Sequence, residues 1–156
     1  MAIVLGARTM KRIAFDLDET LGVPLIEGEA IVGFQCRPGC PELLARLQPR
    51  FTLCLWSVSS RNYVDKCLSF GLASWFSETY SWDEMPASWK DVRRIDADLL
   101  VDDSPHHREA AANCGLANRY VVVPLYGCPE DTADPLAWVR VVERAAGLHA
   151  VEKGGG

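Results

Sequence analysis

An apolar run that stops at two carboxylates is the feature that most constrains the fold of this chain. Ile-Ala-Phe at residues 13–15 is followed directly by Asp-Leu-Asp-Glu-Thr at residues 16–20. Such a run predicts a β-strand buried on both faces, which ends in carboxylates where the next loop holds charge. If the chain turns here, both carboxylates can face a cation and a phosphate together. An acidic turn after a strand is the alternative interpretation, and this stretch alone does not separate the two.

Two further apolar runs end in the same way. Residues 51–56 stop at Ser57, and residues 99–101 stop at an aspartate pair. The carboxyl ends of parallel strands meet at the sheet edge where open α/β folds bind ligands. An acidic turn explains one of these strand ends, but not all three. The sequence therefore predicts one site, formed by Asp16, Asp18, Ser57, Lys90, Asp102 and Asp103.

Strands and helices alternate along the chain. Apolar and β-branched runs predict strands at residues 12–17, 51–57, 78–82, 98–103 and 120–123. Capping residues, prolines and glycines bound helices at residues 41–47, 59–71, 104–115 and 135–147. We therefore predict an α/β, Rossmann-like, doubly wound fold, with a mostly parallel five-stranded sheet and helices on both faces.

Two details of this fold follow from local pattern. Glycines at residues 22, 28 and 33 separate short β-branched runs, which predicts a β-hairpin flap that hangs over the acidic loop. The helical spacing of the last helix predicts that it buries Leu136, Val139, Val142 and Ala146.

Length and composition favour a single catalytic domain. The chain has 156 residues, which we divide into an extension at residues 1–9, a domain at residues 10–148 and a flexible tail at residues 149–156. The net charge of −5 gives no basic footprint for nucleic acid, although it does not exclude one. No apolar run approaches the roughly 20 residues that cross a bilayer, so we expect no membrane partner and a cytoplasmic location.

The six cysteines do not indicate a disulfide scaffold at this size and composition. Cys36 and Cys40 have the spacing of half a zinc site, but the sequence contains no second pair to complete it. Buried reduced thiols are the expected state of Cys54, Cys67 and Cys114.

Over residues 12–125 the sequence resembles the haloacid-dehalogenase-like (HAD) phosphohydrolases at all four of their motifs. Asp16-Leu-Asp18-Glu-Thr20 resembles the first motif, Ser57 the second, Lys90 the third and Asp102-Asp103 the fourth. Arg37-Pro-Gly, Trp56-Ser-Val-Ser and Val101-Asp-Asp-Ser-Pro105 are most similar to the capless NIF/FCP-type branch, which acts on the RNA polymerase C-terminal domain. Those phosphatases usually carry Asn where this chain has Asp103.

The resemblance implies a Mg²⁺-dependent phosphomonoesterase that works through an aspartyl-phosphate. Asp16 is the expected nucleophile and a metal ligand, and Asp18 is the expected acid and base, with its backbone carbonyl on the metal. Thr20 is expected to order the loop and Ser57 to hold phosphate oxygens. Lys90 is expected to be catalytic, since it offsets charge on both the nucleophile and the transferring phosphoryl group. Asp102 and Asp103 are the remaining expected metal ligands, with Asp103 in direct contact with the ion.

The spacing of the motifs indicates an open site. About 40 residues separate Asp16 from Ser57 and about 33 separate Ser57 from Lys90, fewer than the ~50 at which domains begin, so no large cap domain fits. The phosphorylated substrate can then be a small molecule or a macromolecule. A catalytically silent binding module and a phosphotransferase to an acceptor other than water are the alternatives.

Other residues near the motifs carry weaker indications. Trp82 and Trp89 flank a polar loop and are candidates for a substrate wall, although core packing also explains them. His106 and His107 are adjacent on a helix, so both cannot face the site, and we expect a surface or supporting role. Arg61 is interpreted as a solvated helix charge.

Overall fold

The fold is that of a computed structural model, which describes residues 4–5 and 8–148. The expected tail at residues 149–156 lies outside the described residues, as does part of the expected extension. Within that extension, β1 (Val4–Leu5) and β2 (Arg8–Thr9) pair as a two-stranded antiparallel sheet, which the sequence did not predict. None of the helices described between residues 4 and 148 is long and apolar enough to cross a membrane.

Five parallel strands form the central sheet, in the order β7-β6-β3-β8-β9. These strands are β3 (Arg12–Phe15), β6 (Thr52–Trp56), β7 (Glu78–Tyr80), β8 (Leu99–Asp102) and β9 (Tyr120–Val122). The chain builds outward from β3 to β7 and then returns to β8 on the other side of β3, so the topological switch point lies between β3 and β8. The predicted five-stranded α/β fold is confirmed.

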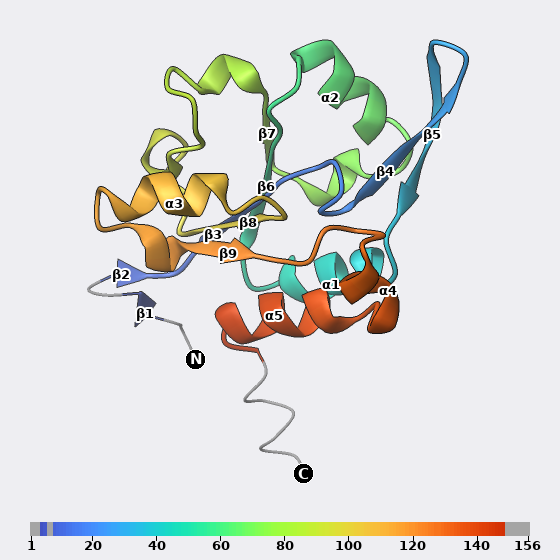
Figure 1. Cartoon of the computed structure of the whole chain (residues 1–156). Helices are drawn as coiled ribbons and strands as arrows, with labels where there is room; N and C mark the ends of the chain where they lie inside the picture. The colour runs from blue at the N-terminus through green and yellow to red at the C-terminus, as the bar shows by residue number, and fades with distance from the viewer. Residues whose placement is uncertain (1–3, 6–7, 149–156) are drawn as a thin grey trace.

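Helices cover both faces of this sheet (Figure 1). α1 (Cys40–Leu47), α2 (Arg61–Leu68) and α5 (Ala137–Ala145) pack on one face. α3 (His106–Ala112) and the short helix η3 (Val92–Arg94) pack on the other. The single-turn helices η1 (Ala73–Trp75), η2 (Trp82–Glu84) and η4 (Ala117–Arg119) lie in the connections.

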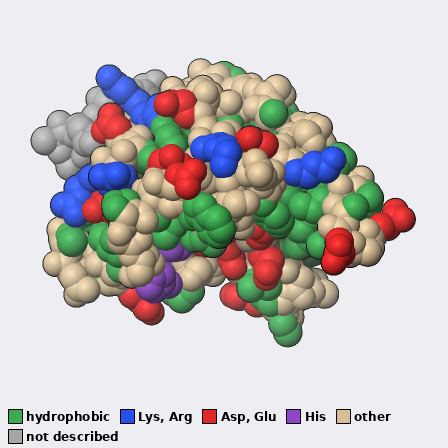
Figure 2. Space-filling model, turned by 90° about the horizontal axis from the view of Figure 1, so that it is seen from above, with side chains coloured by type: hydrophobic (Ala, Val, Ile, Leu, Met, Phe, Trp, Pro, Cys, Tyr) green, Lys and Arg blue, Asp and Glu red, His purple; other side chains and the backbone are tan. Residues whose placement is uncertain are grey.

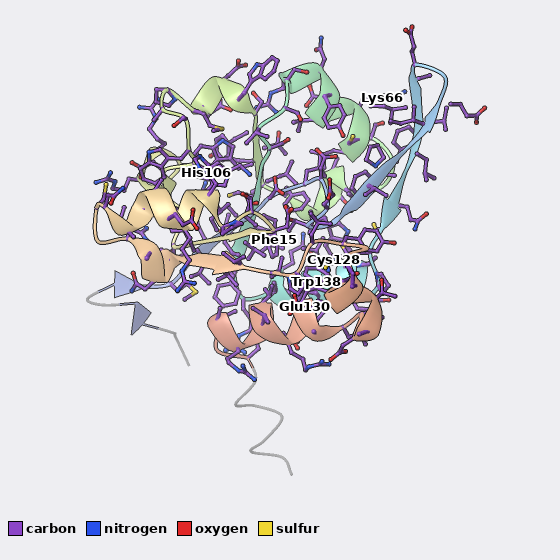
Figure 3. The ribbon with its side chains drawn as sticks, in the orientation of Figure 1. Phe15, Lys66, His106, Cys128, Glu130 and Trp138 are labelled. Carbon is purple, nitrogen blue, oxygen red and sulfur yellow. The ribbon has the colours of Figure 1, made fainter. Side chains whose placement is uncertain are left out.

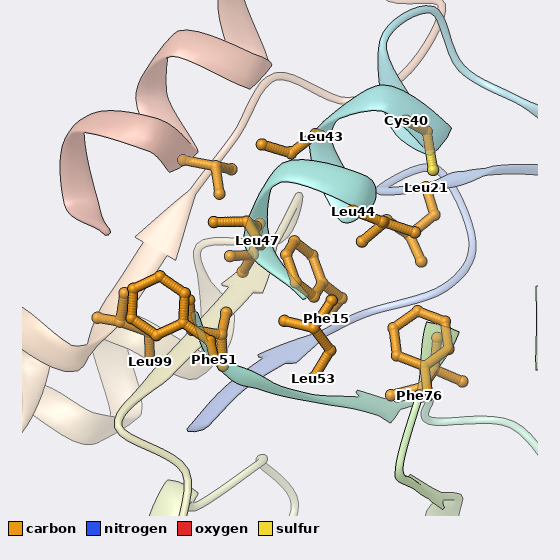
Figure 4. Packing of buried hydrophobic residues seen from close by; sticks show 14 of the residues in the cluster. Phe15, Leu21, Cys40, Leu43, Leu44, Leu47, Phe51, Leu53, Phe76 and Leu99 are labelled. Atoms are coloured by element: carbon orange, nitrogen blue, oxygen red, sulfur yellow. The ribbon is translucent and has the colours of Figure 1, made fainter. Parts of the chain in front are cut away.

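Strand periodicity divides the core into two clusters. Ile13 and Phe15 of β3 point to the face of α1 and α5, whereas Ala14 points to the face of α3. Figure 4 shows Phe15 and Leu53 packed beneath the leucines of α1. Trp138, which is completely buried, enters the same layer from α5 (Figure 3). With both faces of the strands sealed in this way, only their ends are open to ligands.

The predicted hairpin is present as β4 (Gly22–Glu27) and β5 (Ala30–Cys36). Its base adjoins the acidic loop, because Gly22 forms a β-bridge with Asp18. The hairpin then runs beside α2 and its tip projects away from the body of the protein (Figure 1). The expectation that the flap hangs over the acidic loop is therefore wrong for its tip.

The C-terminal segment also differs from the prediction. A short helix, α4 (Pro129–Ala133), precedes α5, and α5 begins at Ala137 rather than at Pro135. Leu136 thus falls at the helix cap and is 47% exposed, so the prediction that it is buried was wrong. Val139, Val142 and Ala146 are buried as predicted.

Candidate active site

The acidic loop begins where β3 ends. The Asp16 N–H donates to the Val101 carbonyl at 2.9 Å, which sets Asp16 level with the end of β8. The loop then turns sharply, since Glu19 has a φ of 65° and the Leu21 N–H donates to the Leu17 carbonyl at 3.0 Å. This turn places the side chains of Asp16 and Thr20 on the same side as the end of β8.

Three carboxylates converge at this edge. Asp16, Asp102 and Asp103 each offer an oxygen within 4.8 Å of the others. The Thr20 hydroxyl lies between two of them, at 2.9 Å from Asp16 Oδ2 and 3.0 Å from Asp103 Oδ1, and it accepts the Asp103 N–H. Burial, a hydrogen bond with the Asp16 carboxylate and the neighbouring negative charges raise the pKa of Asp103 to about 7. The cluster holds more negative charge than its surroundings balance, which is the condition that a hard divalent cation relieves.

Lys90 supplies the cluster's buried positive charge. Its ammonium, which is fully buried, lies 2.9 Å from Asp16 Oδ1 and 2.8 Å from Asp102 Oδ2. Burial alone would lower the pKa of Lys90, but the charges of Asp16 and Asp102 outweigh it and raise that pKa. Lys90 is therefore a fixed cation between the two carboxylates; its contact with Asp102 was not predicted from the sequence.

Two side chains from distant elements hold the backbone of Lys90. The Lys90 N–H donates to His107 Nδ1 at 3.0 Å, and the Tyr120 hydroxyl donates to the Lys90 carbonyl at 2.7 Å. Burial lowers the pKa of His107 to about 4, so the ring is neutral and carries its proton on Nε2, 3.7 Å from Asp102 Oδ2. His107 thus has the supporting role that the sequence allowed for one of the two histidines. Nothing in the sequence indicated Tyr120.

Asp18 lies outside the three-carboxylate cluster. Its Oδ1 accepts a hydrogen bond of 2.5 Å from the Tyr63 hydroxyl of α2. Burial raises the pKa of Asp18, the charge of Asp16 adds to this rise, and the Tyr63 hydrogen bond opposes it. A carboxyl group with a raised pKa, two residues beyond Asp16, is suited to exchanging protons. Tyr63 was missed because a tyrosine on an amphipathic helix gives no signal of this contact.

Ser57 lies at the same sheet edge, directly after β6, and is almost completely buried. Its N–H donates to the Tyr80 carbonyl at 3.1 Å, and its hydroxyl accepts the Ser59 N–H at the same distance. Because Leu55 of β6 pairs with Phe15 of β3, Trp56 is level with Asp16, and Ser57 lies one residue further along the sheet than Asp16.

A second buried cation contacts the acidic loop. Arg37 donates to the carbonyls of Thr20 and Glu19, at 3.2 and 3.5 Å, and to Asp131 Oδ1 at 2.6 Å. Its guanidinium also lies over the ring of Trp138, 4.7 Å from the centroid. Arg37-Pro-Gly was part of the resemblance, but its partner Asp131 was not predicted.

Of the residues predicted near the rim, Trp82 is exposed and Trp89 packs against Tyr120. Arg61 is anchored to Thr79 by two hydrogen bonds, and His106 contacts the Ser88 carbonyl, so neither is a free charge facing the site. Figure 2 shows acidic side chains gathered in a hollow near the lower edge of that view, bordered by hydrophobic ones. Trp82 remains a candidate for a substrate wall, whereas Trp89 is largely a packing residue.

Comparison with known proteins identifies a phosphatase family. A model of the NLI interacting factor-like phosphatase family matches residues 11–122, which include every predicted site residue. The comparison with curated proteins gave no match.

Solved structures share the fold at low sequence identity. A Thermotoga maritima protein assigned as a β-phosphoglucomutase aligns with a TM-score of 0.61 at 15% identity, over 86% of this chain and 99% of that one. A HAD-superfamily hydrolase of Geobacter sulfurreducens aligns at 0.54 and 15%, over 81% and 100% of the two chains. The fission yeast RNA polymerase II CTD phosphatase Fcp1, bound to beryllium fluoride, aligns at 0.57 and 15%, over 76% and 42%. The chain therefore spans less than half the length of that phosphatase.

Proposed function

The chain belongs to the NLI interacting factor-like phosphatase family, and from this premise we propose that it is a Mg²⁺-dependent phosphomonoesterase that forms an aspartyl-phosphate on Asp16. The observation that carries the proposal is the set of contacts around this carboxylate. One oxygen faces the Lys90 ammonium and the other faces the Thr20 hydroxyl. These contacts orient Asp16 as an ionised nucleophile at the open edge of the sheet.

The acidic cluster fits the metal. Asp16, Asp102 and Asp103 would hold Mg²⁺, together with the Asp18 backbone carbonyl. Burial, and then the contact with Asp16 and the charges of Asp16 and Asp102, raise the pKa of Asp103 to about 7, and a bound cation would favour its charged form. When bound, Mg²⁺ would screen the repulsion between Asp16 and the phosphate. We assign Asp103 to direct contact with the ion and Asp102 to a supporting position, because Asp102 Oδ2 contacts the Lys90 ammonium and Asp102 Oδ1 accepts the Ser104 N–H.

The reaction proceeds in two displacements. Asp16 attacks the phosphorus, the bond to the leaving oxygen breaks, and protonated Asp18 gives that oxygen its proton. Asp18 then takes a proton from water, whose oxygen attacks the phosphorus and releases inorganic phosphate from Asp16. Lys90 and Ser57 stabilise the charge on the transferring phosphoryl group. The raised pKa of Asp18 supports its role as the proton donor.

The substrate is a phosphomonoester admitted without a cap domain. The hairpin tip projects away from the acidic loop, and the described chain holds no further domain over the sheet edge (Figure 1). The open site is thus compatible with a phosphate on a small molecule or on a macromolecule.

Asp16→Asn tests the mechanism. Asn keeps the shape but cannot form the acyl phosphate, so release of phosphate from a panel of phosphomonoesters should fall to the background while circular dichroism stays unchanged. Asp18→Asn should still be phosphorylated on Asp16 from a reactive donor but should turn over slowly. Asp83→Asn, on the exposed η2 helix, is the matched control and should keep full activity. Undiminished, Mg²⁺-dependent turnover by Asp16→Asn would remove the proposed mechanism. A lack of turnover by the parent protein on every ester, with Mg²⁺ present, would favour a binding module instead.

A further inference from the structure

The proposed hydrolysis does not use two cysteines at the base of the hairpin. Cys36 is the last residue of β5 and Cys40 is the first of α1. A tight turn joins them, since the Cys40 N–H donates to the Arg37 carbonyl at 3.1 Å and Gly39 has a φ of 86°. The Cys40 thiol forms a hydrogen bond with the Cys36 sulfur. Two cysteines whose side chains interact across such a turn are candidates for a disulfide, which requires that their Cα atoms lie within about 7 Å.

The two thiols differ in access and in acidity. Cys36 is half-buried, whereas Cys40 is fully buried. The hydrogen bond from Cys40 lowers the pKa of Cys36 to about 7 against the effect of burial. By contrast, burial raises the pKa of Cys54 to about 11. Cys36 therefore combines access to solvent with the thiolate character that reaction with an oxidant requires, and Cys40 is placed to react second.

The pair also adjoins the acidic loop. Cys36 pairs with Gly22 at the start of β4, and Cys40 packs beside Leu21 (Figure 4). Between the two cysteines, Arg37 donates its N–H to the Leu21 carbonyl at 2.9 Å and its guanidinium to the Thr20 carbonyl. A covalent link between the sulfurs would therefore act on the residue that holds the loop carrying Asp16.

A metal is a poorer explanation of the pair. Zinc needs at least three protein ligands. Among the described residues, the one group of three or more potential ligands is the aspartate cluster, so Cys36 and Cys40 have no third partner.

We propose that Cys36 and Cys40 form a dithiol site that hydroperoxides oxidise to a disulfide, and that the disulfide lowers the activity of the acidic loop through Arg37. The Cys36 thiolate attacks the O–O bond, which breaks and leaves a sulfenic acid on Cys36 and, from hydrogen peroxide, one water. The Cys40 thiol then attacks the Cys36 sulfur and expels a second water. In total, the two thiols lose two protons and two electrons, which convert one hydrogen peroxide into two waters.

The sequence allows a direct test by mass spectrometry. Trypsin does not cut the Arg37-Pro38 bond, so residues 13–46 form one peptide with both cysteines, and the other four cysteines fall in four other peptides. After treatment of the full chain with one equivalent of hydrogen peroxide and then iodoacetamide, this peptide should be lighter by two hydrogens and unalkylated. The peptide with the exposed Cys114 should remain alkylated.

The activity measurement rests on the proposed function, whereas the mass measurement does not. Peroxide should lower phosphate release several-fold, and dithiothreitol should restore it. Cys36→Ser and Cys40→Ala should both resist this loss, and Cys114→Ser should lose activity as the parent does. Full alkylation of both cysteines after peroxide would overturn the dithiol site. A disulfide that leaves phosphate release unchanged would overturn its effect on the loop.

Discussion

Two buried cations contact the same acidic loop, and the structure balances them differently. Arg37 has a single carboxylate partner, Asp131, and its other contacts are with backbone carbonyls and with the Trp138 ring. Lys90 contacts Asp16 and Asp102, with Asp103 beside them. The Arg37 region is thus neutral, whereas the Lys90 region keeps a surplus of negative charge. This difference supports the proposal that Arg37 stabilises the shape of the loop, whereas the carboxylates around Lys90 bind a further cation.

The largest effect on stability is expected for Arg37→Met. Removing one partner of a buried ion pair leaves Asp131 unpaired and costs about 3–5 kcal/mol of unfolding free energy. Urea denaturation measures this loss. Arg37→Met combined with Asp131→Leu should recover part of it, because no uncompensated charge then remains. If the double variant is no more stable than the single one, Arg37 acts through its carbonyl and ring contacts rather than through charge.

For Lys90→Met, measured at saturating Mg²⁺, we expect a larger loss of catalysis and a smaller loss of stability than for Arg37→Met, because the bound cation would offset part of the charge that Lys90 leaves unpaired on Asp16 and Asp102. Removing one preorganised charge from the transferring phosphoryl group lowers kcat by about 10²–10³-fold. Steady-state phosphate release at saturating Mg²⁺ measures this effect. Lys66→Met, on α2 and over the Phe70 ring, removes a lysine outside the site and should leave turnover unchanged. Equal turnover in the Lys90 and Lys66 variants would refute the role of Lys90.

Magnesium binding should depend on the carboxylates around Lys90 and not on Arg37. A ligand that binds only the folded state stabilises it by about 2.7 kcal/mol at 100 times its Kd. The parent protein and Arg37→Met should gain the same unfolding free energy from Mg²⁺, and EDTA should remove the gain. Asp16→Asn combined with Asp103→Asn should gain much less, because two of the three carboxylates are lost. An equal gain in this double variant would place the metal elsewhere.

The sequence predicted the Lys90 region better than the Arg37 region, and the reason is geometric. Apolar strands that stop at polar residues are a local signal, and parallel strands must end at a common edge, so Asp16 and Asp102 could be placed together before any coordinates. Lys90 could be assigned to the same site because it lies between Ser57 and Asp102 in the sequence, in the order of the family motifs. Asp131 could not be paired with Arg37, because 94 residues separate the two and α4 was not predicted.

The other differences have the same origin. Tyr63 contacts Asp18 because of the way α2 is rotated about its axis against the acidic loop. The spacing of apolar residues in the sequence does not determine this rotation. The direction of the hairpin depends on its packing beside α2, so glycines and β-branched residues predicted the hairpin but not where its tip points. The start of α5 depends on α4, which displaced Leu136 to an exposed cap.

The ion pair between Asp91 and Arg93, which is partly exposed, should contribute less to the unfolding free energy than either of the two buried cations. The Arg93 guanidinium hydrogen-bonds Asp91 and lowers the pKa of that carboxyl, while most of the Arg93 side chain is in solvent. Because the folded pKa lies below the unfolded value of about 3.9, the pair contributes stability above that value and loses it as the pH falls. Asp91→Asn can keep the cap on the Arg93 N–H, so it isolates the charge. We expect its urea midpoint to fall slightly at neutral pH, less than for any variant above. The difference should vanish in high salt and once the pH falls below the lowered pKa of Asp91 in the folded state. A loss as large as that of Arg37→Met would show that charge pairing, rather than burial, distinguishes the two cations at the acidic loop.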